Sequence, residues 1–570
     1  MDKNEILGPL ERELRRRKRR FKAFVAIALF AFGWAVYWLI FAEIPRDHDN
    51  PVDHFKYGSI GSEAYGGLPL GLWEALPAAF PEHLPDPSAY QAIPADRRGP
   101  LDGYRQFGFV TEPGRPRPIG FSVRRRGVDW IGLNCAVCHV GAIRVSDGMD
   151  PAQLYRDTPV TFASSGAETT PASSSRERAI VLGMPANTVN LTAYFEFLFD
   201  CAQDPRFTVD YLMAHMKAAG KVGPIQALFY QRAIPAVREG LLTRRAQLAW
   251  TERNPPAGPG RIDTFNPYWT MIFNYPWNGT NGVADFPSIW NQRPREGMRL
   301  HWDGNNTSVH ERNLSAAFGA GATPVSVDLP RMRMVADWIG SPQDPDAPPD
   351  PVARQEVTPR AGEMEIPRFP FPIDAALAAR GREIYFTADS DPSRPGAQSC
   401  ASCHDFSGSE VGKVTPISAI GTDRHRLDSF TDDLVANQNT LGVGHPWRFH
   451  HFRKTNGYAN HPLDGIWARA PYLHNGSVPT LRDLLEPPER RPTTFYRGDD
   501  EYDPERVGFR GDRAISADGR RLFPYEVEAV GSSGNGGNGN GGHLYGLEFD
   551  EADKNALVEY LKTEGGGDTP

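Results

Sequence analysis

Cysteine is scarce in this chain. Only five cysteines occur among 570 residues, so the 40% of apolar residues must supply the core without a disulfide scaffold. A basic excess is also missing, because 62 Lys and Arg against 70 Asp and Glu give a formal net charge of −8. That balance offers no electrostatic footprint for nucleic acid. These features indicate a folded chain that is too long for one ordinary core.

Long apolar runs are rare too, and one of them has the length of a membrane span. Residues 23–42 read AFVAIALFAFGWAVYWLIFA without a charge, close to the roughly 20 residues that cross a bilayer. A block of arginines and one lysine at 15–20 precedes it, so the positive-inside rule keeps the N-terminus in the cytoplasm. We therefore expect a bacterial inner-membrane protein with a cytoplasmic basic segment at 1–22, a single transmembrane anchor at 23–44 and a periplasmic remainder. A cleaved signal peptide and a buried core helix are the alternatives.

A proline-rich stretch divides the rest of the chain. Residues 341–371 contain SPQDPDAPPDP and PRFPFP, and proline disrupts a helix because it lacks the amide proton and clashes with the preceding turn. This stretch predicts a linker between an N-terminal domain at 45–340 and a C-terminal domain at 372–570, each of which contains one cysteine cluster. Helical patterns mark the first domain at 189–199 and 207–217.

Two short cysteine motifs carry the prediction of haem. Residues 135–139 read CAVCH and residues 400–404 read CASCH, and both have the C-x-x-C-H form that attaches c-type haem. Two thiols one turn apart can bond to one edge of the porphyrin, and the adjoining histidine then lies under the iron. A thioredoxin-like dithiol or half a zinc site requires no such histidine. The predicted ligands are the thioether residues Cys135, Cys138, Cys400 and Cys403 and the proximal histidines His139 and His404. The fifth cysteine, Cys201, is expected to be a buried thiol without a partner.

Methionine is absent from the whole segment after Met364, so the second haem has no downstream methionine as its sixth ligand. Histidines remain as candidates. The possible ligands in this half are His425, His445, His450, His451, His461, His474 and His543. Two have distinctive contexts, because His474 lies in a tight turn and His543 ends the glycine-rich run GSSGNGGNGNGGH.

Four further motifs resemble those of a known family. They are FPSIWN at 286–291, HWDGNN at 301–306, GIWARAPYLHNGS at 465–477 and GGHLYG at 541–546. Together with the paired haem motifs, they resemble the bacterial di-haem cytochrome c peroxidase superfamily and, within it, the rubber-oxygenase-like branch. The resemblance covers most of residues 100–565.

The resemblance implies a mainly α fold of two cytochrome c-like haem domains with long loops, here preceded by the transmembrane helix. It also implies two covalently bound haem c groups. The haem on His139 is expected to activate dioxygen or peroxide, and the haem on His404 is expected to relay electrons from or to a small cytochrome c. His543 is the first candidate for the sixth ligand of the second haem, and His474 is the second.

The sequence departs from the peroxidases where they carry a Gln and a Glu for O–O cleavage. Arg312 stands at the Gln position, and residues 321–323 offer no acid at the Glu position. Trp302 and Phe318 are expected to line an apolar distal pocket instead, which disfavours ordinary peroxidase turnover. The alternative function is a non-catalytic electron carrier with two six-coordinate irons.

Overall fold

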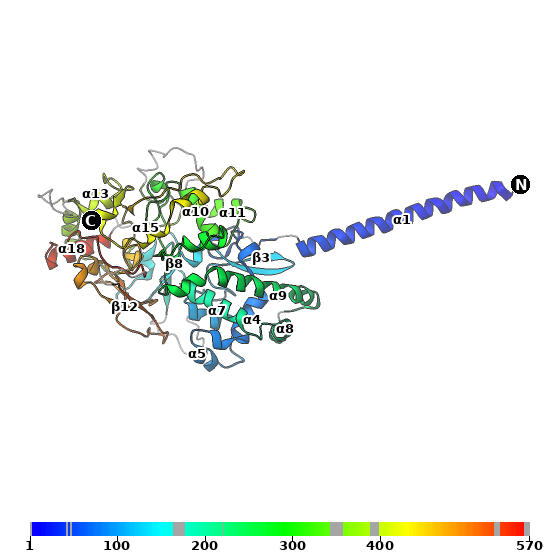
Figure 1. Ribbon diagram of the computed structural model, residues 1–570, viewed down its shortest axis with the longest axis horizontal. Coiled ribbons are helices and arrows are strands. Elements are labelled where there is room, and N and C mark those ends of the chain that lie inside the picture. Colours follow the sequence, from blue (N-terminus) through cyan, green and yellow to red (C-terminus); the bar gives the residue numbers. More distant parts are fainter. Residues whose placement is uncertain are drawn as a thin grey trace.

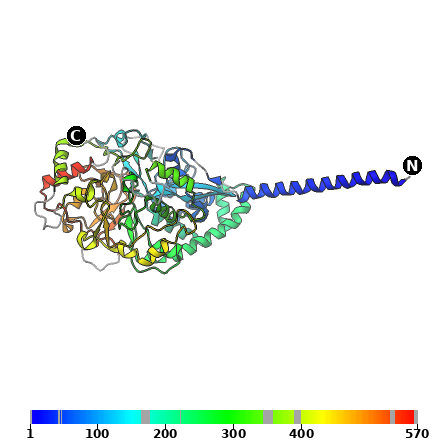
Figure 2. The ribbon, with the colours of Figure 1, turned by 90° about the horizontal axis from the view of Figure 1, so that it is seen from above.

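The computed structural model describes residues 3–41, 44–45, 48–163, 177–220, 222–341, 357–387, 398–528 and 536–563. Helix α1 (Lys3–Phe41) extends as one long rod from a body that holds the other elements (Figure 1, Figure 2). The other helices are α2 (Pro51–Tyr57), α3 (Glu63–Gly66), α4 (Leu70–Ala79), α5 (Pro87–Ala92), α6 (Leu101–Tyr104), α7 (Leu191–Gln203), α8 (Val209–Ala218), α9 (Pro224–Gln247), α10 (Val309–Gly319), α11 (Leu329–Trp338), α12 (Ala375–Phe386), α13 (Cys400–His404), α14 (Ile417–Ile420), α15 (His425–Ser429), α16 (Asp432–Gln438), α17 (Leu481–Leu484) and α18 (Glu551–Leu561).

The predicted transmembrane anchor at 23–44 is not supported. No helix within the described residues combines the length and the apolar character that a membrane crossing requires. Residues 42 and 43 of the predicted anchor lie outside the described residues.

The body contains many short strands. They are β1 (Ile44–Pro45), β2 (Leu68–Pro69), β3 (Phe121–Arg126), β4 (Val128–Leu133), β5 (Val140–Arg144), β6 (Phe162–Ala163), β7 (Arg178–Leu182), β8 (Arg261–Asp263), β9 (Val283–Asp285), β10 (Val414–Pro416), β11 (Gly457–Ala459), β12 (Thr494–Arg497), β13 (Tyr502–Asp503), β14 (Gly508–Phe509) and β15 (Phe523–Glu526). The largest sheet has the order β1-β3-β4-β2, and a second has the order β5-β7-β6. The remaining strands form the antiparallel pairs β8-β9, β10-β11, β12-β15 and β13-β14.

The predicted mainly α fold is therefore wrong. Of the described residues 42% are helical and 12% are in strands, so the body mixes helices with small sheets. The β3-β4 hairpin is an example, with Phe121 opposite Leu133 and a turn at Gly127, whose φ is +72°. Strands this short give a weak alternation signal beside the helical patterns, because few residues sample the two-residue period.

The strongest helical patterns are confirmed. The patterns at 189–199 and 207–217 correspond to α7 and α8, which are capped by the side chains of Asn190 and Thr208. In the second half α12 packs against α18, and Gly381 permits a close approach. A Cβ at this glycine would lie only 1.9 Å from the carbonyl oxygen of Ala556.

One apolar core connects residues from both halves of the chain. It includes Trp290 and Trp467, and it also takes in Met364, Phe369 and Phe371 from the described part of the predicted linker. Residues 342–356 of that linker lie outside the described residues. Through this core, the segments around the two cysteine motifs share one packed interior.

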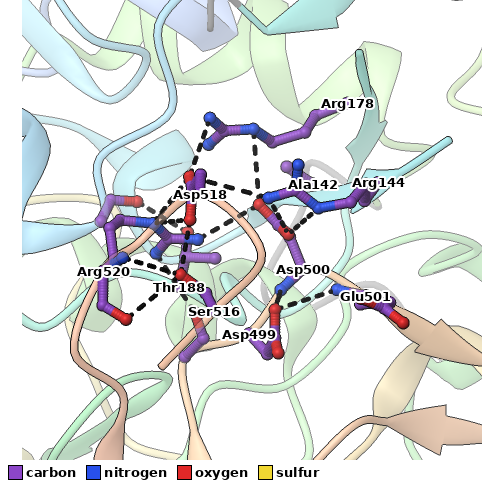
Figure 3. Close-up of polar contacts among 12 residues, drawn as sticks. Ala142, Arg144, Arg178, Thr188, Asp499, Asp500, Glu501, Ser516, Asp518 and Arg520 are labelled. Atoms are coloured by element: carbon purple, nitrogen blue, oxygen red, sulfur yellow. Dashed lines mark hydrogen bonds and ion pairs between the residues drawn. The ribbon is translucent and has the colours of Figure 1, made fainter. Parts of the chain in front are cut away.

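A buried network of charges also joins the halves. Figure 3 shows Arg144, Arg178 and Arg520 gathered around Asp500 and Asp518. Asp500 is fully buried and lies 2.8 Å from Arg144, 3.4 Å from Arg178 and 3.2 Å from Arg520. Because an unpaired buried charge is costly, these contacts hold the C-terminal segment to strands β5 and β7.

Candidate functional site

The first cysteine motif forms a tight turn between β4 and β5. The side chain of Asn134 accepts a hydrogen bond from the amide of Ala136 at 3.0 Å and donates one to the carbonyl of Gly58 at 2.9 Å. Gly120 packs against the turn with a φ of +90°, and a Cβ there would lie 2.4 Å from the backbone of Val137. These contacts fix the turn that presents Cys135, Cys138 and His139.

His139 is oriented by a backbone carbonyl. Its Nδ1 lies 2.8 Å from the carbonyl oxygen of Pro287, in the FPSIWN motif. Since a carbonyl only accepts, Nδ1 carries the proton, and the lone pair of Nε2 is left for a metal. Burial lowers the pKa of His139 to about 4, so the imidazole is neutral near pH 7 and able to ligate.

The second motif repeats this arrangement on helix α13. Ser399 caps the helix by accepting from the amide of Ser402. The Nδ1 of His404 donates to the carbonyl of His461 at 2.8 Å, and burial lowers the pKa of His404. Both motifs therefore hold a neutral histidine with its Nε2 lone pair available, as an axial haem ligand requires.

The thiols are not those of a reactive dithiol. Burial raises the pKa of Cys135 to about 11 and that of Cys400 to about 11, and it also raises the pKa values of Cys138 and Cys403. Redox-active and nucleophilic cysteines have lowered values. Cys201 is fully buried in α7, and its burial confirms that part of the prediction.

His543 faces His404. The centroids of their rings are 6.2 Å apart, with 35° between the ring planes. Two imidazoles on opposite sides of one metal, each with a metal–nitrogen distance of about 2 Å, have centroids roughly 6 Å apart. The Nδ1 of His543 is buried without a hydrogen-bond partner in the described structure, and the ring meets that of Tyr545 edge-on, with the centroids 5.1 Å apart. These residues fit a haem between the two rings.

Hydrogen bonds hold the loop that carries His543. The buried guanidinium of Arg491 donates to the carbonyls of Asn540 at 2.5 Å and Gly542 at 3.0 Å. The amide of His543 itself donates to the carbonyl of Ile420 at 2.8 Å. These hydrogen bonds fix the backbone of this part of the glycine-rich run and so hold His543 in place.

His474 has a different environment. It is 4% exposed and stacks on Tyr458, with the ring centroids 4.3 Å apart. The Tyr458 hydroxyl donates to the carbonyl of Asp423 at 2.7 Å and lies 3.0 Å from the Nε2 of His474. Because the hydroxyl has one proton, this Nε2 carries a proton and donates to the phenol oxygen. Burial lowers the pKa of His474 to about 3.

The two residues predicted for the distal pocket lie in different settings. Phe318, on α10, is 3% exposed and packs with Trp447 and Phe449 in an aromatic cluster that also contacts Cys135. Trp302 is half-buried, and its Nε1 donates to the carbonyl of Asp285 at 2.9 Å. Phe318 is therefore brought to the first cysteine motif, whereas Trp302 is tied to strand β9.

Glu311 secures this aromatic cluster. Its fully buried carboxylate accepts from the amide of His450 at 2.7 Å and from the amide of His451 at 3.0 Å. The Nδ1 of His451 lies 2.8 Å from the same carboxylate. These contacts join the segment that carries Phe449 to α10, the helix that carries Phe318.

Two histidines near the motifs have contacts that the sequence did not predict: His461, until now only a candidate ligand, and His301. The Nε2–H of His461 donates to the carbonyl of His301 at 2.9 Å, while the carbonyl of His461 accepts from His404. His301 has a φ of +62° and a buried Nε2 without a hydrogen-bond partner in the described structure. In the sequence, His301 was marked only by its position next to Trp302. The role of His461 could not be seen, because a backbone carbonyl that accepts a hydrogen bond is not marked by any residue type.

Comparisons with known proteins agree with a haem-binding region. Residues 457–496, which include His461 and His474, match the family described as RoxA-like, cytochrome c-like. The chain is 30% identical over 318 residues to the uncharacterized protein y4iM of Sinorhizobium fredii, a match that covers 49% of this chain and 64% of that relative. It is 24% identical over 548 residues to the uncharacterized protein y4iJ of the same organism, with 83% of each chain covered. The match thus spans just under two thirds of y4iM.

The family match supports the resemblance to the rubber-oxygenase-like branch. It indicates a haem cytochrome with covalently bound haem c. The matched segment supplies the carbonyl of His461 that orients His404, so the family similarity and the site geometry meet at the second cysteine motif.

Proposed function

We propose that this chain is a di-haem c-type cytochrome that works as an oxidoreductase. One haem is held by Cys135, Cys138 and His139, and dioxygen or peroxide is activated there. The other is held by Cys400, Cys403 and His404, with His543 as its sixth ligand, and it relays electrons. A c-type haem bound at each motif supplies a redox-active iron.

An asymmetry between the two motifs supports this assignment. His404 has a second imidazole at 6.2 Å, the separation expected across a shared iron. His139 has no such paired ring in the part of the chain that the structure describes, and an aromatic cluster with Phe318 lies beside its motif instead. One closed site and one open site suit a relay and a reaction centre.

The residues of the chain have three roles in this function. The cysteines fix the edge of each haem covalently. The carbonyls of Pro287 and His461 orient the proximal rings and set their tautomers. The cluster around Phe318 excludes water from the open face, which strengthens electrostatic interactions there.

Spectroscopy of the purified protein tests the function. We expect two covalent haem additions by mass, together with a ferric resonance spectrum that contains one high-spin and one low-spin haem. Two low-spin haems would favour the electron carrier, and a single haem addition would contradict the di-haem assignment.

Steady-state kinetics then test the kind of reaction. With a small cytochrome c as donor, we expect slow peroxide reduction, because the half-buried Arg312 stands where the peroxidases have a Gln and no acid follows. Loss of one positioned catalytic group commonly costs about a hundred- to a thousandfold in rate. Fast turnover would instead indicate a peroxidase whose proton shuttle lies elsewhere.

A further inference from the structure

His301 occupies an unusual position. Its backbone φ of +62° lies in the left-handed region, which side chains other than glycine seldom adopt, although histidine and asparagine do so more often than most. Its Nε2 is buried without a hydrogen-bond partner among the described residues. Both features carry a cost in free energy, and such costs cluster at functional sites.

The ring of His301 lies beside the aromatic cluster that packs against the first cysteine motif. Its centroid is 6.4 Å from that of Phe452, which is 5.7 Å from Phe449, and Phe449 is in turn 5.7 Å from Phe318. Cys135 packs against the same aromatic cluster. The ring therefore borders the aromatic cluster that packs against the first cysteine motif.

His301 is neutral in this setting. Burial lowers its pKa well below the usual value, and the positive charges of Arg426 and Arg312 act in the same direction. A neutral imidazole has one N–H donor, and an apolar pocket makes a hydrogen bond from that donor strong.

The backbone of His301 is held from the second site. The Nε2–H of His461 donates to the carbonyl of His301, and the carbonyl of His461 accepts from the proximal His404. This chain of two hydrogen bonds fixes residue 301 relative to the second haem site, so His461 acts as a positioning residue for it.

We propose that His301 donates a hydrogen bond, through its buried Nε2, to small ligands bound in the open pocket of the His139 haem. This rests on the function proposed above. The imidazole then supplies a hydrogen-bond donor beside the aromatic cluster, which stabilises ligands with partial negative charge such as dioxygen, peroxide or cyanide.

Equilibrium titration of the ferric holoprotein with cyanide tests this role. His301→Gly removes the ring and tolerates a positive φ, and we expect the cyanide dissociation constant to rise about tenfold. His301→Asn keeps a shorter donor and also tolerates this backbone, so the rise should be smaller. His461→Phe should give an intermediate rise, since it removes only the positioning contact.

His445→Phe is the matched control. His445 is exposed, and its ring stacks on Trp447 of the same cluster at 4.8 Å, so this variant should bind cyanide as the wild type does. Equal cyanide affinity in His301→Gly and wild type would overturn the donor role. A first haem that is low-spin in the wild type and turns high-spin in His301→Gly would also overturn it, because His301 would then be an iron ligand.

A failure of the proposed function can be distinguished from a failure of the donor role of His301. If neither the wild type nor His301→Gly binds cyanide or shows a high-spin haem, no open site exists, and the donor role falls with it. If the wild type binds cyanide and His301→Gly binds it with the same affinity, the open site stands and the role of His301 is refuted.

Discussion

Replacing Arg491 by methionine should loosen the sixth ligand of the second haem without touching either histidine. The guanidinium is 2% exposed and donates from Nη1 to the carbonyls of Asn540 and Gly542, directly before His543. Its Nε also donates to the carbonyl of Glu486 at 2.9 Å, which anchors it outside the loop. Arg491→Met keeps an unbranched apolar stem, is two atoms shorter than arginine, and removes these donors.

The size of the effect follows from the bonds lost. A hydrogen bond to a charged group contributes about 1.5–3 kcal/mol. Three of them reach the loop, including a long one of 3.4 Å from Nη2 to the carbonyl of His543, so the free energy that holds the loop closed should fall by about 3 kcal/mol or more. That corresponds to roughly a hundredfold change in the equilibrium between ligated and released His543.

Cyanide competition at the second haem measures this change. The cyanide concentration that half-displaces the low-spin His543 signal should fall roughly a hundredfold in Arg491→Met. Arg490→Met is the control, since Arg490 is the neighbouring residue and its side chain is 75% exposed, 4.0 Å from Glu486. An unchanged midpoint in Arg491→Met, with the protein still folded, would refute the view that this arginine holds the ligand loop.

Three further outcomes are expected. Cys135→Ala and Cys400→Ala should each reduce the mass of attached haem by one group after denaturing electrophoresis with haem staining; retention of both groups in either variant would contradict the attachment sites. His543→Ala should turn the second haem high-spin in ferric resonance, and His474→Ala should leave it low-spin; the reverse result would exchange the two assignments. Asp500→Asn should lower the free energy of unfolding by about 3–5 kcal/mol in denaturant titrations, because it leaves buried guanidinium groups short of a counter-charge; a loss below about 1 kcal/mol would show that the network is already compensated.

The sequence predicted those features that depend on local chemistry. The turn at 135–139 follows from the motif itself, and the last helix begins where Asp550 caps the amide of Asp553. The methionine-free segment after Met364 directed attention to histidine, and the structure brings His543 opposite His404. In each case a few neighbouring residues carry the information.

Features that depend on distant backbone groups escaped prediction. The acceptors for the two proximal histidines are carbonyls of Pro287 and His461, 148 and 57 residues away in the sequence. Every residue has a carbonyl, so no residue type marks these positions. The strained backbone of His301 is likewise set by its surroundings, since a φ of +62° is not written in the identity of a histidine.

These long separations bear on how the sites hold together. Closing a long loop costs conformational entropy, and here the chain pays that cost to bring His543 to His404 while leaving the Nδ1 of His543 and the Nε2 of His301 buried without hydrogen bonds. Bonds that form in the folded chain and not in the unfolded one stabilise the fold. The thioether bonds of a haem on Cys400 and Cys403 would persist on unfolding, whereas ligation by both His404 and His543 would form only in the folded chain and would tie the two segments together. In the proposed function, the stability of the second site and its electron relay therefore depend on the same histidine, His543.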